Sequence, residues 1–234
     1  MKLFLLFLST GLLGVSSVSA SPTPPNAEEP GHRRGDECRI NPQSLTYCAG
    51  TNYSAALVST YICGDWRLGP VQLPTKIPLD SVLELYDRLG GLCPGEFLDA
   101  FWNETLKPDP YWNFPTEHGF SLDSVTGKPI KGALVLEVGV LVDRFGGEGG
   151  TFVSPAAAPY MQRALPPSNL NTPKNDPTFP YNYHVYRVIK PLLVEAGPIA
   201  PWFRQPGQGV QYSLSQNISM LLNQQYLQHE DPGR

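Results

Sequence analysis

Residues 142–167, VDRFGGEGGTFVSPAAAPYMQRALPP, combine arginines, glycines and aromatic residues, and this mixture decides how the chain is interpreted. A second stretch of the same kind, PIAPWFRQPGQGVQY, covers residues 198–212. Glycine lets a backbone approach a ligand closely, the arginine fork binds phosphate through two hydrogen bonds, and aromatic rings stack on flat heterocycles. The two stretches therefore favour a binding site for a nucleotide-like ligand.

Branched apolar residues predict central β-strands over residues 133–142 and 184–194. Residues 210–214 alternate in polarity, so Gln211 should face a cleft while Val210 and Tyr212 face the other side. The seven prolines of residues 154–183 fit neither helix nor sheet and predict a long functional loop.

Helices are expected at two places. Near residue 80, Asp80 is a candidate N-cap, and an apolar stripe ends at a pair of glycines. The stripe consists of Val82, Leu83, Tyr86 and Leu89. A second helix is predicted over residues 219–228.

The cysteines all lie in the N-terminal half: Cys38, Cys48, Cys63 and Cys93. An even number in an exported chain predicts two disulfides, and the sequence leaves all three pairings open. A zinc site is disfavoured because the spacings contain no close C-x-x-C pair.

Residues 1–20 have the layout of a secretory signal peptide, with Lys2, an apolar run and small residues before Ala20. We therefore expect a secreted protein, extracellular or at the cell surface, without a membrane-spanning segment. Three sequons, at Asn52, Asn103 and Asn217, are expected glycosylation sites. The net charge of −4 and the even scatter of basic residues argue against a nucleic-acid partner.

These features predict a β-rich α+β fold, in which a central antiparallel or mixed sheet forms the larger domain, the candidate catalytic domain, and a small disulfide-stapled helical subdomain precedes it. The expected organisation is a signal peptide (1–20), a proline-rich flexible leader (21–36), a disulfide-containing N-terminal subdomain (37–108), a catalytic domain (109–228) and a polar tail (229–234).

Two arginines are the main candidates for ligand contact. Arg144 follows an apolar strand and precedes Phe145 and a glycine loop, although a surface ion pair with Glu148 would also explain it. Arg163 enters the proline-rich loop, where a fixed backbone could aim its fork at a pyrophosphate; packing against an aromatic ring is the alternative. His118 and His184 are interpreted as structural histidines.

In the order and combination of several short segments, the chain resembles the tuberculosis necrotizing toxin-like domain family, in particular its fungal secreted NAD+ glycohydrolase branch. The matching segments are residues 111–120, 143–146, 150–155, 163–167, 202–203 and 211–212. The resemblance implies hydrolysis of NAD+ to nicotinamide and ADP-ribose, with NADP+ as a second candidate substrate and no cofactor required for catalysis.

The resemblance also implies roles for particular residues. Gln211 would be the central catalytic amide and Arg163 the second catalytic candidate, binding the pyrophosphate side together with Arg144. Phe145 and Phe152 would flank the nicotinamide end, and Trp202 is a candidate for the pocket wall. A structural Ca2+ site near Glu230 and Asp231, and a homodimer, are further features of that branch.

Two other functions fit parts of the sequence. A secreted, glycosylated, disulfide-bonded adhesion module needs no active site, and its aromatic residues would then belong to the core. A secreted ribonuclease would need a basic groove, which the negative net charge disfavours.

Overall fold

The structure is a computed structural model, and it describes residues 46–105 and 111–231. The expected signal peptide, the leader and Cys38 lie outside these ranges. All of the described residues belong to one compact unit. Within the described ranges, no helix combines the length and the apolar character needed to cross a bilayer.

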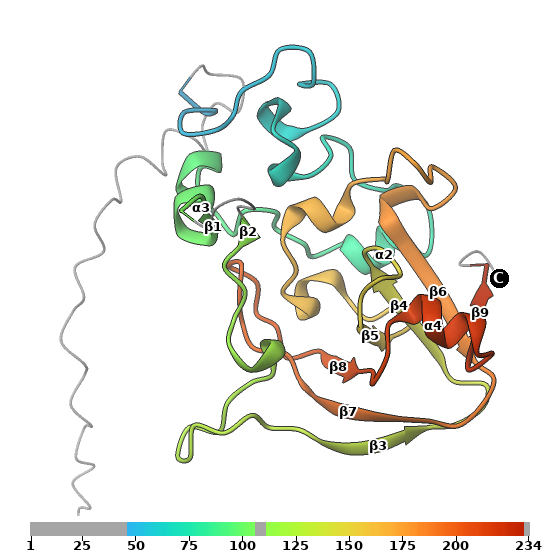
Figure 1. The fold of residues 1–234 in the computed structure, drawn as a ribbon. Coiled ribbons are helices and arrows are strands. Elements are labelled where there is room, and N and C mark those ends of the chain that lie inside the picture. Colours follow the sequence, from blue (N-terminus) through green and yellow to red (C-terminus); the bar gives the residue numbers. More distant parts are fainter. Residues whose placement is uncertain (1–45, 106–110, 232–234) are drawn as a thin grey trace, which may run out of the picture. The chain divides into compact units, whose positions relative to one another are not determined.

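A seven-stranded sheet in the order β3-β7-β8-β5-β4-β6-β9 dominates this unit (Figure 1). Every neighbouring pair in it is antiparallel. Its strands are β3 (Gly132–Leu136), β4 (Leu141–Phe145), β5 (Phe152–Pro155), β6 (Tyr183–Val188), β7 (Leu192–Pro198), β8 (Val210–Ser213) and β9 (Leu227–Glu230). A separate pair consists of β1 (Trp102–Asn103) and β2 (Tyr111–Trp112). The predicted β-rich α+β fold is confirmed, with an antiparallel sheet.

The two long predicted strands are each divided in two. The first is interrupted at residues 137–140, where Gly139 adopts a φ of 94° that favours glycine. The second is interrupted just before β7 by Pro191, which cannot donate a hydrogen bond to a sheet. The expectation that residues 133–142 form a central strand was wrong in part, because β3 lies at the sheet edge with four of its five residues exposed.

The α-helices are short: α2 (Leu79–Leu83), α3 (Pro94–Phe101) and α4 (Ile218–Asn223). Asp80 does not cap α2, since Pro78 occupies the N-cap and Asp80 lies in the first turn. The predicted apolar stripe is nevertheless buried along its whole length. The predicted C-terminal helix ends early at Asn223, and after Gln225, at φ 59°, the chain continues as β9.

Short 3-10 helices fill the connections: η1 (Ile62–Gly64), η2 (Trp66–Leu68), η3 (Glu117–Gly119), η4 (Tyr160–Arg163), η5 (Pro167–Leu170) and η6 (Pro180–Asn182). Three of them, η4 to η6, lie in the proline-rich stretch between β5 and β6. The prediction of an irregular connection there is confirmed.

The disulfide Cys48–Cys63 joins residues 15 positions apart, with Cα atoms 5.5 Å from each other. Cys93 is disulfide-bonded as well. The structure thus selects, among the three pairings open to the sequence, the one that joins Cys48 to Cys63.

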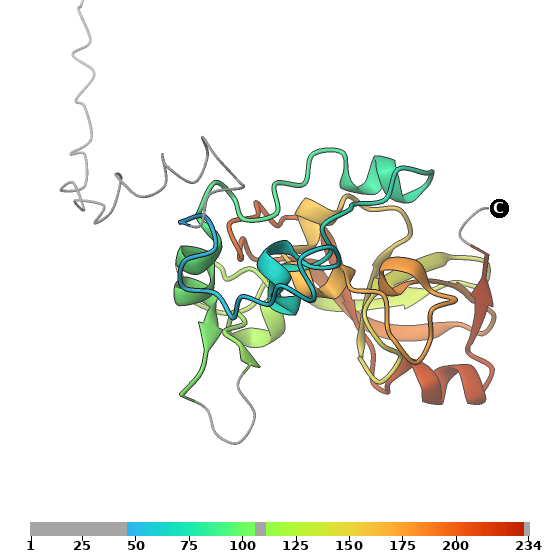
Figure 2. The ribbon, with the colours of Figure 1, turned by 90° about the horizontal axis from the view of Figure 1, so that it is seen from above.

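The segment 46–105 shares hydrophobic clusters with the segment 111–231. Val82, Leu83 and Tyr86 pack with residues of β4 and β6 such as Phe145. A second cluster joins Phe97 of α3 to residues such as Phe203. Figure 2 shows residues 46–105, in blue to green, gathered beside the sheet strands. The domain boundary near residue 108 stays a prediction.

Candidate active site

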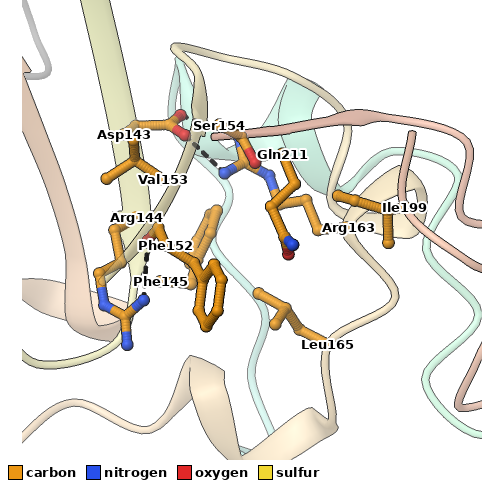
Figure 3. A pocket seen from close by; sticks show the side chains of 10 residues that line it. All are labelled: Asp143, Arg144, Phe145, Phe152, Val153, Ser154, Arg163, Leu165, Ile199 and Gln211. Atoms are coloured by element: carbon orange, nitrogen blue, oxygen red, sulfur yellow. Dashed lines mark hydrogen bonds and ion pairs between the residues drawn. The ribbon is translucent and has the colours of Figure 1, made fainter. Parts of the chain in front are cut away.

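A pocket opens beside strands β4, β5 and β8, and ten side chains line it (Figure 3). They are Asp143, Arg144, Phe145, Phe152, Val153, Ser154, Arg163, Leu165, Ile199 and Gln211. The cavity that they enclose is small, about 40 Å³, and the space around it out to the open mouth is about 330 Å³. All residues to which the sequence assigned a catalytic or binding role, except Trp202, lie in this one pocket.

The sheet register explains why residues distant in sequence meet here. Strand β5 lies between β8 and β4, with Phe152 opposite Ser213 and Ser154 opposite Asp143. Because residues two apart on a strand face the same side, Gln211 of β8 lies on the same face as Ser213 and hence as Phe152. The antiparallel order therefore places the amide beside the aromatic ring.

Arg163 is already engaged in the pocket wall. Its Nη1 and Nη2 donate to the two carboxylate oxygens of Asp143, and its Nε and Nη2 donate to the carbonyl oxygen of Ala158. The side chains of Arg163 and Asp143 are buried, with relative exposures of 3% and 0%. Arg163 also lies over the ring of Phe145, 5.1 Å from its centroid, so that the aromatic packing considered from the sequence is present.

Asp143 is the residue of the pocket that the sequence analysis failed to single out. Besides Arg163 it accepts hydrogen bonds from the hydroxyl of Tyr183 and the backbone amide of Ala157, both at 2.8 Å. The available signal was a carboxylate in the otherwise apolar run Leu141-Val142-Asp143, since a charge buried in a strand needs a partner.

Arg144 has a different environment. Its Nε donates to the carbonyl oxygen of Gly147 at 2.9 Å and its Nη1 to that of Phe152 at 2.8 Å. Burial lowers the pKa of its guanidinium from the ordinary value, and within the described ranges no carboxylate forms an ion pair with it. Glu148, the partner considered from the sequence, accepts instead from the hydroxyl of Tyr186.

Gln211 projects into the pocket from β8 (Figure 3). Its Nε2 donates to the backbone carbonyl oxygen of His118 at 2.9 Å. This bond fixes the orientation of the amide and leaves Oε1, an acceptor, for other hydrogen bonds.

The two phenylalanines differ in exposure. Phe145 is 1% exposed, and its ring packs between Tyr160 and Tyr183 at centroid distances of 4.9 and 4.7 Å. Phe152 is half-buried and lies among the side chains that line the pocket (Figure 3). Phe152 therefore offers a ligand more ring surface than Phe145 does.

Trp202 lies outside the pocket. It packs in the cluster around Phe97, with its ring 6.2 Å from that of Phe101, and its Nε1 donates to the carbonyl oxygen of Asn113. Trp202 is therefore a half-buried residue that packs against this cluster.

His184 fits the structural interpretation made from the sequence. It is 4% exposed, stacks on Phe179 at a centroid distance of 4.1 Å, and has Nε2 3.1 Å from the Oδ1 of Asn182. Burial lowers the pKa of its imidazole below the ordinary value. A buried histidine held neutral in this way stabilises the fold best above its unfolded-state pKa.

The residues expected near calcium offer little for a cation. Glu230 belongs to β9, and its Oε1 accepts from the Nε of Arg187. Within residues 46–105 and 111–231, no group of three or more His, Cys, Asp or Glu side chains could hold a metal ion. The calcium site stays a prediction, and no step of the chemistry below depends on it.

The pocket of this β-rich fold gathers two arginines, two phenylalanines and a glutamine, groups that suit a ligand with phosphates and flat rings. Residues 135–229 match the family model described as tuberculosis necrotizing toxin. A relative in Aspergillus fumigatus, the conidial surface nicotinamide adenine dinucleotide glycohydrolase nadA, is 50% identical over 184 residues, which are 79% of this chain and 76% of that protein. The chain belongs to the tuberculosis necrotizing toxin family, in the branch that contains this fungal protein.

Solved structures give weaker likenesses. Tuberculosis necrotizing toxin in complex with its immunity factor has a TM-score of 0.40 and 20% identity, covering 90% of this chain and 98% of that chain. Rhs1-CT in complex with its cognate immunity protein has a TM-score of 0.29 and 18% identity, covering 43% of this chain and 77% of that chain. The assignment to the family rests on the sequence matches.

Proposed function

We propose that this protein is an NAD+ glycohydrolase, which cleaves the nicotinamide–ribose bond of NAD+ and releases nicotinamide and ADP-ribose. The observation that carries the proposal is the single pocket that holds Gln211, Arg144 and Phe152 in a member of this family. NADP+ is a second candidate substrate.

The chemistry suits a pocket without a pair of catalytic carboxylates. The bond between the ribose C1′ and the pyridinium nitrogen breaks, its electron pair stays on nicotinamide, and a water oxygen forms the new bond to C1′ and releases one proton. Since nicotinamide leaves as a neutral molecule, no general acid has to protonate it, in contrast to the leaving oxygen of ordinary glycosides. The enzyme has to fix the substrate and shield the cationic sugar while one water enters, and it needs no cofactor for this.

Arg144 is the better candidate for the pyrophosphate. Its guanidinium carries a positive charge that only backbone carbonyls and solvent now balance within the described part of the chain. Desolvation of an unpaired cation is costly, and a bound phosphate would supply the missing counter-charge.

Arg163 has a more limited part in the proposal. Because Asp143 and Ala158 occupy most of its donors, it cannot turn its whole fork toward a phosphate without leaving Asp143. We propose that Arg163 forms part of the pocket wall and supports the ring of Phe145. Its one remaining Nη1 hydrogen can donate to the substrate.

Gln211 is the proposed catalytic amide. Its Oε1 can accept a hydrogen bond from a ribose hydroxyl or from the attacking water, while the bond from Nε2 to His118 prevents the amide from turning away. Phe152, with Phe145 behind it, would flank the nicotinamide end.

The remaining expectations about the mature protein also belong to this proposal. We infer that it is exported as a disulfide-bonded glycoprotein, located outside the cell or at its surface. Asn217 caps α4 through Oδ1, with Met220 N at 2.9 Å, so its Nδ2 stays available for a glycan. A homodimer would bury the apolar pair Val135 and Leu193, which face each other across β3 and β7 and are 44% and 63% exposed.

The test is the release of nicotinamide from NAD+ by the purified, disulfide-bonded protein. Gln211→Ala should lower kcat at least about tenfold, equal to about 1.4 kcal/mol of barrier. Gln228→Ala, on the exposed part of β9, is the matched control and should behave as wild type. No release by the wild type would favour the adhesion module, and a normal rate in Gln211→Ala would remove Gln211 from the mechanism.

A further inference from the structure

The turn Glu117–Gly119 is held in an unusual backbone conformation. Glu117, His118 and Gly119 have consecutive φ angles of 52°, 56° and 81°. Non-glycine residues with positive φ are uncommon, and where they cluster they often belong to functional sites.

Hydrogen bonds to the strand ends hold this turn in place. Ser121 N donates to the carbonyl oxygen of Pro198 at 2.8 Å, and Ala200 N donates to that of Gly119 at 2.9 Å. Phe120 forms a β-bridge with Ile199, a pocket residue, and is itself 1% exposed. The turn is therefore a rigid attachment to the edge of the pocket.

His118 contacts two pocket residues from this turn. Its carbonyl oxygen accepts the hydrogen bond from Gln211, 93 positions further along the chain. Its imidazole ring is 6.0 Å from the ring of Phe152, at an interplanar angle of 38°, and the residue is exposed. Both parts of the residue therefore contact residues that line the pocket.

We propose that His118 is a further substrate-binding residue, whose ring joins Phe152 in holding the nicotinamide ring of the substrate. The proposal rests on the proposed NAD+ glycohydrolase function. A flat ring that lies against Phe152 comes within reach of His118, because the two side-chain rings are already within the distance range of interacting aromatic groups. Aromatic faces attract the positive charge of the pyridinium, and neutral nicotinamide lacks that charge after cleavage, so the product is held less tightly.

Three variants separate the ring from the backbone of the turn. His118→Asn removes the ring, while asparagine tolerates the left-handed conformation that the position requires. His118→Phe keeps an aromatic ring at the same position. Glu117→Asn changes the neighbouring exposed residue, which also has a positive φ, and is the matched control.

Steady-state kinetics with NAD+ and inhibition by each product measure the effect. In His118→Asn, the KM for NAD+ should rise about fivefold, with kcat within about twofold of wild type. The inhibition constant of nicotinamide should rise less, about twofold, because neutral nicotinamide lacks the positive charge. The inhibition constant of ADP-ribose should not change, and Glu117→Asn should behave as wild type. His118→Phe, which keeps an aromatic ring, should have a lower KM for NAD+ than His118→Asn.

Each other result overturns the proposal. Unchanged constants in His118→Asn remove the contact, and weaker inhibition by ADP-ribose alone places the ring at the adenosine end. A fall in kcat with unchanged KM in His118→Asn would mean that His118 positions Gln211 and does not bind the substrate. An equal rise of KM in Glu117→Asn would mean that the effect comes from the backbone of the turn and not from the histidine ring. A wild type that releases no nicotinamide refutes the proposed function itself, whereas an active wild type with an unaffected variant refutes only this inference.

Discussion

Replacing Asp143 by asparagine should destabilise the protein strongly. The carboxylate is 0% exposed and accepts hydrogen bonds from Arg163, from the hydroxyl of Tyr183 and from the amide of Ala157. Asparagine keeps the shape of the side chain, but it removes the negative charge and turns one acceptor atom into a donor. Arg163 would then be a buried cation without its counter-charge.

The size of the effect follows from the burial of the pair. Removing one partner of a buried ion pair costs about 3–5 kcal/mol, because the remaining charge is left uncompensated. In a chain of this length, each kcal/mol lowers Tm by about 2–4 °C. We therefore expect Asp143→Asn to lower Tm by at least about 6 °C, and to lower activity at temperatures where the wild type is still folded.

Thermal unfolding followed by circular dichroism is the assay. Asp99→Asn, on the exposed side of α3, is the control and should leave Tm unchanged. In a double-mutant cycle with Arg163→Gln, the double variant should be destabilised by less than the sum of the two single variants, since each single variant already removes the same interaction. A Tm of Asp143→Asn within about 2 °C of wild type would refute the reasoning.

Three further outcomes can be measured. Arg144→Gln should raise the KM for NAD+ about tenfold with little change in kcat, because the interaction with the pyrophosphate is made equally in the ground and transition states; a change in kcat alone would contradict this. Burial lowers the folded-state pKa of His184, so the unfolded chain gains a proton before the folded protein does as the pH falls. The Tm of the wild type should therefore decrease as the pH falls from about 6.5 toward the lower folded-state pKa. An equal dependence of Tm on pH in His184→Gln would show that His184 is not the cause. Replacing both Cys48 and Cys63 by alanine should lower the free energy of unfolding by about 3 kcal/mol, the value expected for a 15-residue loop, and urea denaturation with an unchanged midpoint would disprove it.

Local patterns in the sequence predicted the features that depend on neighbouring residues. Branched apolar runs indicated the strands, and the dense prolines indicated the irregular connection between β5 and β6. The even number of cysteines predicted disulfides, of which Cys48–Cys63 is present. The choice among pairings depends on which Cα atoms the fold brings within bonding distance, and the sequence alone does not contain that distance.

The sequence also pointed to half of the ten residues that line the pocket: Gln211, Arg144, Arg163, Phe145 and Phe152. What it determined was residue chemistry: a guanidinium, an aromatic ring or an amide at each position, on a strand or beside a glycine. It grouped Trp202 with these residues, whereas the structure packs that ring against the cluster around Phe97. Nothing near Trp202 in sequence distinguishes these two environments of an aromatic ring.

Only the tertiary structure decided how these groups are used. The carboxylate that occupies the fork of Arg163 is 20 positions away, and the carbonyl that orients Gln211 is 93 positions away, on a turn with strained backbone. The packing of the sheet and its neighbouring turns determines both contacts, because strands β4, β5 and β8 become neighbours only when the sheet forms. The sequence by itself determined which functional groups this protein possesses. The fold decided which charges are neutralised and which, like that of Arg144 within the described residues, have no ion-pair partner. Neutralisation depends on distances of a few ångströms, which only long-range packing establishes.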